Sequence, residues 1–205
     1  MTLRAALLDM DGTIFDSSID FLALRQAMGL PRDGRPILQQ LEGATPDVRS
    51  RALELLHEAE RRGAQAGSLI PGTERLLALL RTHRVQVALI TNNSRTSVDT
   101  VLRRFPLEFD LTLCREDGAT KPAPDLFHRA LESLDVPPEE AMAIGDTHLD
   151  CQAAFGAGIA HIVLIGLPDW MLAHIPTGAA CRHVSDLDAA CLAVAEVLGD
   201  SDSAG

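Results

Sequence analysis

The sequence predicts an α/β protein: a doubly wound parallel sheet with a small all-helical segment inserted after its first strand. Three observations lead to this expectation. Short apolar runs rich in β-branched residues alternate with segments of helical periodicity. One long stretch interrupts that alternation directly after the first run and is helical throughout. Polar clusters follow several of the apolar runs, as they do where the strands of a parallel sheet end at a binding edge.

Five apolar runs are expected to form the strands. They are residues 3–8, 85–90, 109–113, 141–144 and 159–165. Each run is mostly apolar, with at most two polar residues, which is typical of strands that are covered by helices on both faces. The last run lies inside the longest apolar stretch of the chain. His161 and three glycines in that stretch indicate a helix end followed by a strand, not a membrane span.

The helices of the core are expected between these strands. One opens near Gly72, and a second follows Ser94, a favourable N-cap residue. A third carries apolar residues at helical spacing within residues 126–134. A fourth spans residues 149–157 and ends before Gly158, where a left-handed residue commonly closes a helix. Helices and strands of these lengths in alternation predict a Rossmann-like sheet.

The insertion after the first strand is expected to form a helical cap. Residues 19–28 are predicted to form one helix, and Thr45 is expected to cap a longer one, with Pro46 at its first position. Turn residues separate these pieces from each other and from the core. The expected boundaries are residues 1–14 and 72–199 for the α/β core, 15–71 for the cap and 200–205 for a disordered tail.

Composition restricts the partners that are expected. The chain of 205 residues has a formal net charge of −11 and contains no basic run, so neither nucleic acid nor membrane is an expected partner. A small molecule is expected instead. If that molecule is an anion, the acidic protein needs a local positive charge, most simply a bound cation. The sequence does not predict the oligomeric state.

The cysteines and the N-terminus predict a soluble cytoplasmic protein. The cysteines form neither a Cys-x-x-Cys pair nor a dense disulfide pattern, so we expect buried thiols in a reducing compartment. The first apolar run is cut short by Asp9 and Asp11, too early for a signal-peptide core or a membrane span. The cysteines are Cys114, Cys151, Cys181 and Cys191.

Polar side chains follow three of the predicted strands. They are Asp9 and Asp11, Thr91 and Asn92, and Asp146 and Asp150. Because the carboxyl ends of parallel strands share one edge, the four carboxylates are expected to converge there. Such a cluster is costly unless a cation neutralises it, and a set of oxygen ligands suits Mg²⁺. The sequence therefore predicts a magnesium site at this edge.

Lys121 is the only lysine among the eighteen basic side chains. All other positive charges are arginines, so this position is expected to require a compact point charge. A lysine suits a place that contacts both a phosphoryl oxygen and a carboxylate, where a wide guanidinium would fit poorly.

Each motif alone has a plainer interpretation. Asp-x-Asp-Gly can be a turn or the start of a calcium loop, but an EF-hand has its glycine sixth and a glutamate twelfth, whereas Asp20 is twelfth here. Gly-Asp is a common turn, and Asp150 can simply favour a helix N-terminus. The order of the motifs, each at the end of a strand, favours the functional interpretation.

In this order the motifs resemble the haloacid dehalogenase superfamily. The matching segments are Asp9-Met10-Asp11-Gly12-Thr13 for the first motif, Thr91 for the second, Lys121-Pro122 for the third, and Gly145-Asp146 through Asp150 for the fourth. The helical insertion resembles the mobile cap of that superfamily. Its position, together with Ile14-Phe15-Asp16-Ser17, resembles the phosphoglycolate-phosphatase-like branch.

The resemblance implies a Mg²⁺-dependent phosphatase that acts on a small phosphorylated metabolite, either phosphoglycolate-like or a sugar phosphate. Asp9 would be the nucleophile that forms an aspartyl-phosphate, and Asp11 the general acid and base. The implied phosphate ligands are Thr91, the backbone amide of Asn92, and Lys121. The implied metal ligands are Asp9, the backbone carbonyl of Asp11, and Asp146, with Asp150 as a ligand or an adjacent partner.

Other activities on this fold differ at identifiable residues. A dehalogenase does not need Asp11 to protonate a leaving alkoxide, and a phosphonate hydrolase needs a cap lysine, which residues 15–71 lack. A phosphomutase remains an alternative, because it shares the core motifs and differs in how its cap excludes water. A phospho-accepting receiver domain has no Asp-x-Asp pair on strand one, and a non-catalytic binding protein is expected to have a broken motif.

Five further residues were weighed as site candidates. Arg25, Arg32 and Arg35 in the insertion are candidates to contact a carboxylate on the substrate, although arginines on a helical lobe are usually solvated. His148 is expected to be a solvated loop residue, not a catalyst. Trp170 is expected to contribute to packing, not to recognition.

Overall fold

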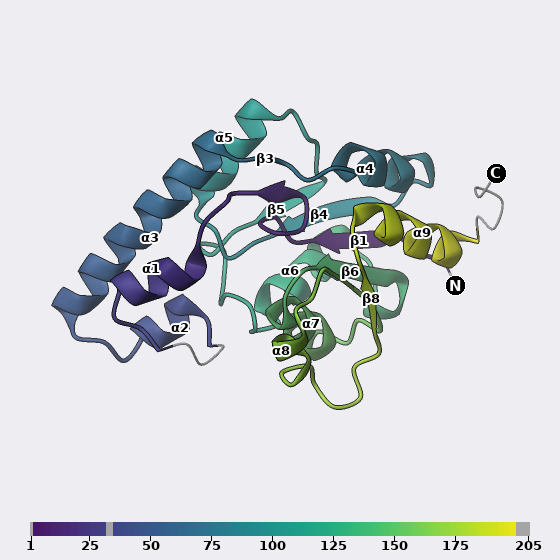
Figure 1. The fold of residues 1–205 in the computed structure, drawn as a ribbon. Coiled ribbons are helices and arrows are strands. Elements are labelled where there is room, and N and C mark those ends of the chain that lie inside the picture. Colours follow the sequence, from purple (N-terminus) through teal and green to yellow (C-terminus); the bar gives the residue numbers. More distant parts are fainter. Residues whose placement is uncertain (1, 32–34, 200–205) are drawn as a thin grey trace.

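The computed structural model describes residues 2–31 and 35–199, so Arg32 and the expected tail lie outside the described residues. The chain forms a six-stranded sheet with helices on both faces and a helical lobe to one side (Figure 1). The strand order is β5-β4-β1-β6-β7-β8, and all neighbours pair in parallel. The chain therefore starts in the middle of the sheet and extends it in both directions, as in a doubly wound fold.

The five expected strands are present. They are β1 (Ala5–Leu8), β4 (Gln86–Ile90), β5 (Leu111–Leu113), β6 (Ala141–Gly145) and β7 (His161–Ile165). A sixth strand, β8 (Cys181–Val184), was not predicted. It lies at the edge, where Arg182 and His183 are exposed, so it lacks the continuous apolar run of a buried strand.

The two faces of the sheet bury two separate clusters. Ala6 and Leu8 of β1 point into the cluster that contains residues of α4 (Thr73–Thr82), α5 (Arg95–Arg104) and α9 (Leu187–Leu198). Ala5 and Leu7 point the other way, toward α6 (Asp125–Leu134) and α7 (His148–Gly156). Burial on both faces explains why these strands are predominantly apolar in the sequence.

The ends of the core helices agree with the expected caps. The side chain of Ser94 accepts a hydrogen bond from the backbone amide of Ser97, which caps α5. Gly158, just beyond α7, has a φ of +82°, in the left-handed region that favours glycine. Two short elements complete the core, the 3-10 helix η1 (Pro138–Glu140) and α8 (Asp169–Leu172).

Three helices form what we call the cap lobe: α1 (Phe21–Ala27), α2 (Ile37–Leu41) and α3 (Pro46–Ala66). Thr45 and Pro46 begin α3 as expected, although the Thr45 side chain makes no capping hydrogen bond. At the base of the lobe, β2 (Phe15–Asp16) and β3 (Ser68–Leu69) pair antiparallel. Two residues are too short to leave a strand period in the sequence, so these strands were not predicted.

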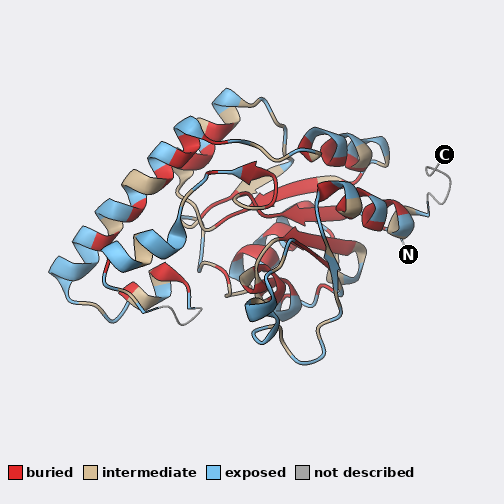
Figure 2. Ribbon diagram, in the orientation of Figure 1, coloured by how far each residue is buried: buried red, intermediate tan, exposed pale blue. Residues whose placement is uncertain are grey.

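Burial differs between the core and the cap lobe. Figure 2 shows buried residues concentrated in the sheet, whereas the outer surfaces of α1 and α3 are largely exposed. Cys114, Cys151 and Cys191 are buried as expected, but Cys181 is only partly buried because it lies on the edge strand β8. Among the helices of the described residues, none is both long and apolar enough to cross a membrane.

Candidate active site

The ends of β1, β4 and β6 bring the predicted polar residues to one edge of the sheet. β1 pairs with β4 on one side and with β6 on the other, so the segments that follow these strands are neighbours. They contribute Asp9, Thr91 and Asp146 to a cavity of about 570 Å³ that lies between the sheet edge and the cap lobe. Asp11, Asn92 and Lys121 line the same cavity. The predicted residues therefore share one floor.

Lys121 joins two of the carboxylates at this floor. Its Nζ lies 2.5 Å from Asp9 Oδ1 and 2.6 Å from Asp150 Oδ1, and it donates to the carbonyl oxygen of Ile90 at 3.2 Å. The side chain is only 3% exposed. Burial alone lowers the pKa of Lys121, but Asp150 and Asp9 more than offset this effect and raise it, so the amine stays charged. Three acceptors around one nitrogen explain why a compact ammonium stands here.

Asn92 fixes the segment that carries Lys121. The backbone amide of Lys121 donates to Asn92 Oδ1 at 2.9 Å, and Asn92 Nδ2 donates to the carbonyl oxygen of Lys121 at 3.0 Å. The Asn92 side chain therefore ties the segment after β4 to the segment that carries Lys121. This contact is separate from the phosphate contact predicted for the Asn92 backbone amide. Sequence analysis assigned only the backbone amide of Asn92.

Asp9, Asp146 and Asp150 form a cluster that fits a divalent cation. One oxygen from each lies within 4.8 Å of the others. With Lys121 as their only ion-pair partner in the described residues, three ionised carboxylates leave two negative charges unbalanced. Burial raises the pKa of Asp9 to about 7 and raises the pKa of Asp146 well above its usual value. Neighbouring carboxylates raise both pKa values further. A divalent cation would offset the repulsion between these carboxylates, and it suits a donor set that contains only oxygen atoms.

Two glycines allow the carboxylates to approach the backbone. Gly12 has a φ of +87°, and a Cβ atom there would lie 2.1 Å from Asp146 Oδ2. A Cβ atom at Gly145 would lie 2.4 Å from the Cβ of Asp150. Both positions therefore exclude any side chain, which gives the glycines of Asp-x-Asp-Gly and Gly-Asp a structural reason.

Asp150 is held from both of its oxygens. Oδ1 accepts from Lys121, and Oδ2 accepts from the backbone amide and hydroxyl of Thr147 at 3.0 and 2.6 Å. Thr147 and Asp150 form a capping box at the start of α7. The pattern Thr-x-x-Asp was readable in the sequence as a helix start, but it was not used to assign Thr147. The arrangement favours Asp150 as the partner that positions Lys121.

Asp11 lies apart from the three clustered carboxylates. Its oxygens accept from the backbone amide and hydroxyl of Ser17 at 3.1 and 2.7 Å. Burial raises the pKa of Asp11, and the bonds from Ser17 oppose that rise only in part. A raised pKa suits a carboxyl group that must donate a proton. Ser17, which no sequence argument singled out for chemistry, links this carboxyl group to the base of the cap lobe.

Thr91 is placed to donate a hydrogen bond into the cavity. It is buried at the end of β4, and its Oγ1 accepts from the backbone amide of Asn93 at 3.1 Å. A hydroxyl that accepts one bond keeps its own proton for another acceptor. An oxygen of a bound phosphoryl group is an acceptor of the right kind.

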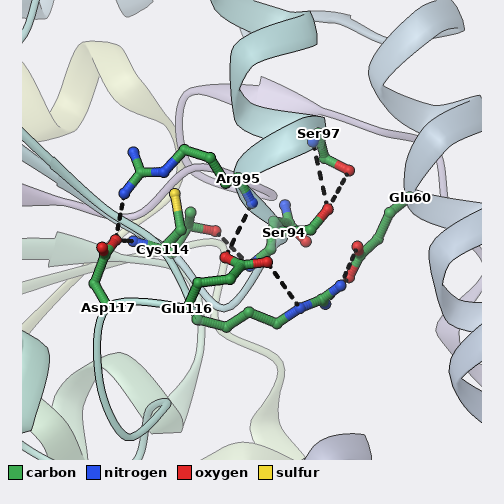
Figure 3. Close-up of polar contacts among 10 residues, drawn as sticks. Glu60, Ser94, Arg95, Ser97, Cys114, Glu116 and Asp117 are labelled. Carbon is green, nitrogen blue, oxygen red and sulfur yellow. Dashed lines mark hydrogen bonds and ion pairs between the residues drawn. The ribbon is translucent and has the colours of Figure 1, made fainter.

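Glu60 of the cap lobe lines the cavity and forms an ion pair with an arginine of the core. Glu60 of α3 accepts from two guanidinium nitrogens of Arg115 at 2.6 and 3.0 Å, across the boundary between the lobe and the core (Figure 3). In the same region Arg95 pairs with Asp117, and the backbone amide of Arg95 donates to Glu116. Sequence analysis did not single out Glu60, because nothing in a helical pattern separates a buried glutamate from its solvated neighbours.

The guanidinium of Arg25 is used within the lobe. Arg25 lines the cavity, but its guanidinium donates to Gln40 Oε1 at 3.1 Å and to the carbonyl oxygens of Arg35 and Pro31 at 2.5 and 3.5 Å. It therefore holds the connection between α1 and α2. Arg35 receives this bond through its backbone, and Arg32 lies outside the described residues.

The expectation that His148 is a solvated loop residue was wrong. His148 is buried at the first position of α7, not solvated in a loop, and its ring lies 4.9 Å from that of His174. The Trp170 ring lies against those of His148 and His174, in line with the expected packing, but the residue is also 56% exposed and lines the cavity. Both residues sit beside loops whose path a single sequence does not specify.

Comparison with known proteins identifies the family. Residues 3–158 match the model of the haloacid dehalogenase-like hydrolases. A haloacid dehalogenase-like hydrolase domain-containing protein of Arabidopsis thaliana is 32% identical over 159 residues, which are 72% of this chain and 64% of that protein. A phosphoglycolate phosphatase of Cupriavidus necator is 28% identical over 180 residues, 76% of this chain and 78% of that enzyme.

Solved structures agree on the fold. The crystal structure of a hydrolase from Pseudomonas syringae superposes with a TM-score of 0.78 at 20% identity, over 95% of this chain and 99% of that one. Because the family model covers most of the chain and the sheet has the same doubly wound form, the expected fold class is confirmed. The chain belongs to the haloacid dehalogenase-like hydrolase family.

Proposed function

We propose that this protein is a Mg²⁺-dependent phosphatase that hydrolyses a small phosphorylated metabolite through an aspartyl-phosphate on Asp9. One observation carries the proposal: a buried ammonium, Lys121, bridges Asp9 and Asp150 at the floor of a cavity, beside Asp146. Phosphoglycolate-like esters and sugar phosphates are the substrates expected from the motifs, and the relative from Cupriavidus necator carries the name of such an enzyme. We also propose residues 15–71 as the cap and residues 1–14 and 72–199 as the catalytic core.

In the first step a carboxylate oxygen of Asp9 attacks phosphorus. The bond between phosphorus and the ester oxygen breaks, and the leaving alkoxide takes the proton of Asp11. The raised pKa of Asp11 supports this role, since the group must be protonated when the substrate arrives. Lys121, Thr91 and the backbone amide of Asn92 hold the phosphoryl oxygens and stabilise their charge in the transition state.

In the second step water attacks the phosphorus of the aspartyl-phosphate. Asp11, now ionised, accepts a proton from that water. The bond between phosphorus and the Asp9 oxygen breaks, which releases inorganic phosphate and restores Asp9. The hydrogen bonds from Ser17 to Asp11 stabilise the ionised form that this step needs.

The metal ligands we propose are Asp9, the backbone carbonyl of Asp11, and Asp146, with Asp150 adjacent. When bound, Mg²⁺ supplies positive charge that offsets the repulsion between the phosphate and the carboxylates. The clustering of Asp9, Asp146 and Asp150 and the space left by Gly12 support this assignment.

Phosphate release from an aryl phosphate tests the proposal. We expect release to require Mg²⁺ and to fall by at least about a thousandfold in Asp9→Asn and in Asp11→Asn. Asp99→Asn serves as a matched control, because Asp99 is exposed on α5 away from the cavity. Undiminished turnover by Asp9→Asn would contradict the proposal. Isomerisation of a sugar phosphate without net phosphate release would identify a phosphomutase instead.

A further inference from the structure

We infer that the substrate is a phosphomonoester whose alcohol carries an aromatic or similarly flat apolar group. The inference rests on the proposed phosphatase function and concerns the part of the cavity above the floor. Most side chains that line that part are apolar, and several of the large ones are exposed, whereas the side chains of the floor are polar and mostly buried.

Apolar side chains from both the lobe and the core line the upper cavity. From the lobe they are Phe21, Leu22, Ile37, Leu38 and Leu56, and from the core Leu149, Trp170 and Met171. A cavity of about 570 Å³ holds more than a phosphate group, so the alcohol part of a substrate must occupy this apolar space. These apolar walls favour the burial of hydrocarbon or aromatic surface, and they provide few hydrogen-bond partners for hydroxyl groups of a substrate.

Three of these side chains are left uncovered by the protein itself. Phe21 is 42% exposed, and Leu22 and Trp170 are each 56% exposed. Helix α1, which carries the first two, contains no buried residue, so neither side chain holds the fold together. Large apolar groups that gather uncovered around one cavity are typical of a ligand site.

The ring of Trp170 is oriented by its neighbours. Its centroid lies 6.1 Å from that of His148 and 6.3 Å from that of His174, with both imidazoles nearly edge-on. His148 is itself buried at the start of α7, beside Asp146 and Asp150 in the sequence. The indole is therefore held next to the catalytic floor before a ligand arrives, as suits contact with a flat group.

Among the described residues, Glu60 and Arg25 are the charged side chains of the upper wall, and both already have partners within the protein. Glu60 is paired with Arg115, and the guanidinium of Arg25 donates to Gln40 and to backbone carbonyls. Apart from Arg25, whose guanidinium is held within the lobe by these hydrogen bonds, a second anionic group on the substrate, such as the carboxylate of phosphoglycolate, would meet apolar side chains and the carboxylate of Glu60. This arrangement disfavours small anionic esters and favours apolar ones.

A panel of esters with similar leaving-group chemistry tests the inference. 2-Phenylethyl phosphate, glycerol 1-phosphate and 2-phosphoglycolate are all esters of primary alcohols, so intrinsic reactivity differs little among them. We expect kcat/KM for 2-phenylethyl phosphate to exceed the other two by at least about tenfold. An equal or lower value would overturn the inference while leaving the phosphatase function intact. No phosphate release from any phosphoester would overturn the proposed function, and the inference with it.

Substitutions in the upper wall test which side chains cause the preference for the aromatic ester. Trp170→Ala and Leu22→Ala are each expected to lower kcat/KM for 2-phenylethyl phosphate about tenfold and to change that for glycerol 1-phosphate less than about twofold. Leu192→Ala is the matched control, because Leu192 is 48% exposed on α9 and does not line the cavity. Equal losses with both esters, or the same loss in Leu192→Ala, would contradict the inference. Urea midpoints close to that of the wild type would show that the variants fold.

Discussion

The floor of the cavity and its upper wall are built in opposite ways. At the floor, buried polar groups come from the ends of sheet strands, and Lys121 and Asp150 have several protein partners each. In the upper wall, the exposed large apolar groups are Phe21 and Leu22 of α1, a helix with no buried residue, and Trp170 of α8. The difference indicates that the reaction is fixed by the rigid sheet edge, whereas the choice of substrate rests on α1 and α8, which can vary without disturbing the chemistry.

The same contrast extends to stability. The sheet is packed between two large clusters, whereas the buried core of the lobe consists of Met28, Ile37, Leu41, Ala52 and Leu56. Three guanidinium contacts tie the lobe to the core: Arg115 binds Glu60, and Arg104 donates to the carbonyl oxygens of Ala64 and Gly67 at 2.6 and 2.8 Å. We therefore expect the lobe to open at a lower free energy than the core.

After the substitutions of Asp9 and Asp11, Lys121→Met should give the largest effect and should act on the floor alone. Without the ammonium, the charge of the transferring phosphoryl group loses its nearest protein partner, so kcat is expected to fall by at least about a hundredfold. The loss should be the same for 2-phenylethyl phosphate and glycerol 1-phosphate, unlike that of Leu22→Ala. Arg103→Met, which removes an exposed cation from α5, controls for net charge. A loss confined to one ester, or to KM, would contradict the separation of floor and wall.

The floor was largely predictable from the sequence. Asp9, Thr91 and Asp146 stand directly after buried strands, and parallel strands must end at one edge, so the pattern alone brought them together. Lys121 was identified by being the only lysine. The glycines of the motifs can also be identified in the sequence, although only the structure shows which aspartate side chain approaches each one.

The wall was not predictable in the same way. Trp170 and His148 meet through a loop and a short helix whose geometry depends on packing, not on a local period. Glu60 looks like any other polar residue of α3, and its burial arises from a partner, Arg115, that lies 55 positions away in the chain. The edge strand β8 was missed for a related reason, because an exposed edge needs no apolar run.

Glu60→Gln should weaken the attachment of the lobe. The side chains of Glu60 and Arg115 are only 3% and 10% exposed, and the substitution leaves the buried guanidinium with only the more distant carboxylate of Glu116, at 3.8 Å. We expect the free energy of unfolding to fall by about 1–3 kcal/mol, measured by urea titration. Glu58→Gln on the same helix is the control, since Glu58 pairs with Arg61 and Arg62 at the surface and its loss should leave the midpoint unchanged. Equal effects would show that the buried pair does not fasten the lobe.

The smallest expected difference concerns helix caps. Ser94→Ala removes the cap of α5, whose residues Val98 and Val101 are buried in the main core, and should cost about 1 kcal/mol of global stability. Asp20 caps α1 by accepting from the amides of Leu22 and Ala23. Since α1 has no fully buried residue and only Leu24 packs partly against the lobe cluster, Asp20→Ala should fray that helix locally and change the global urea midpoint less than Ser94→Ala does. Hydrogen exchange of α1 and α5 would detect both effects, and a larger global cost for Asp20→Ala would reverse the proposed ranking.

Reductive trapping tests the central claim, that Asp9 carries the phosphoryl group. An aryl leaving group departs without being protonated, so Asp11→Asn should still form the intermediate from an aryl phosphate but should hydrolyse it slowly. Borohydride reduces an acyl phosphate to an alcohol, which would convert Asp9 to homoserine. Peptide mass spectrometry should find this change at position 9 only, and only when both substrate and Mg²⁺ are present. Reduction at another carboxylate, or phosphate release with no reduction at Asp9, would contradict the account.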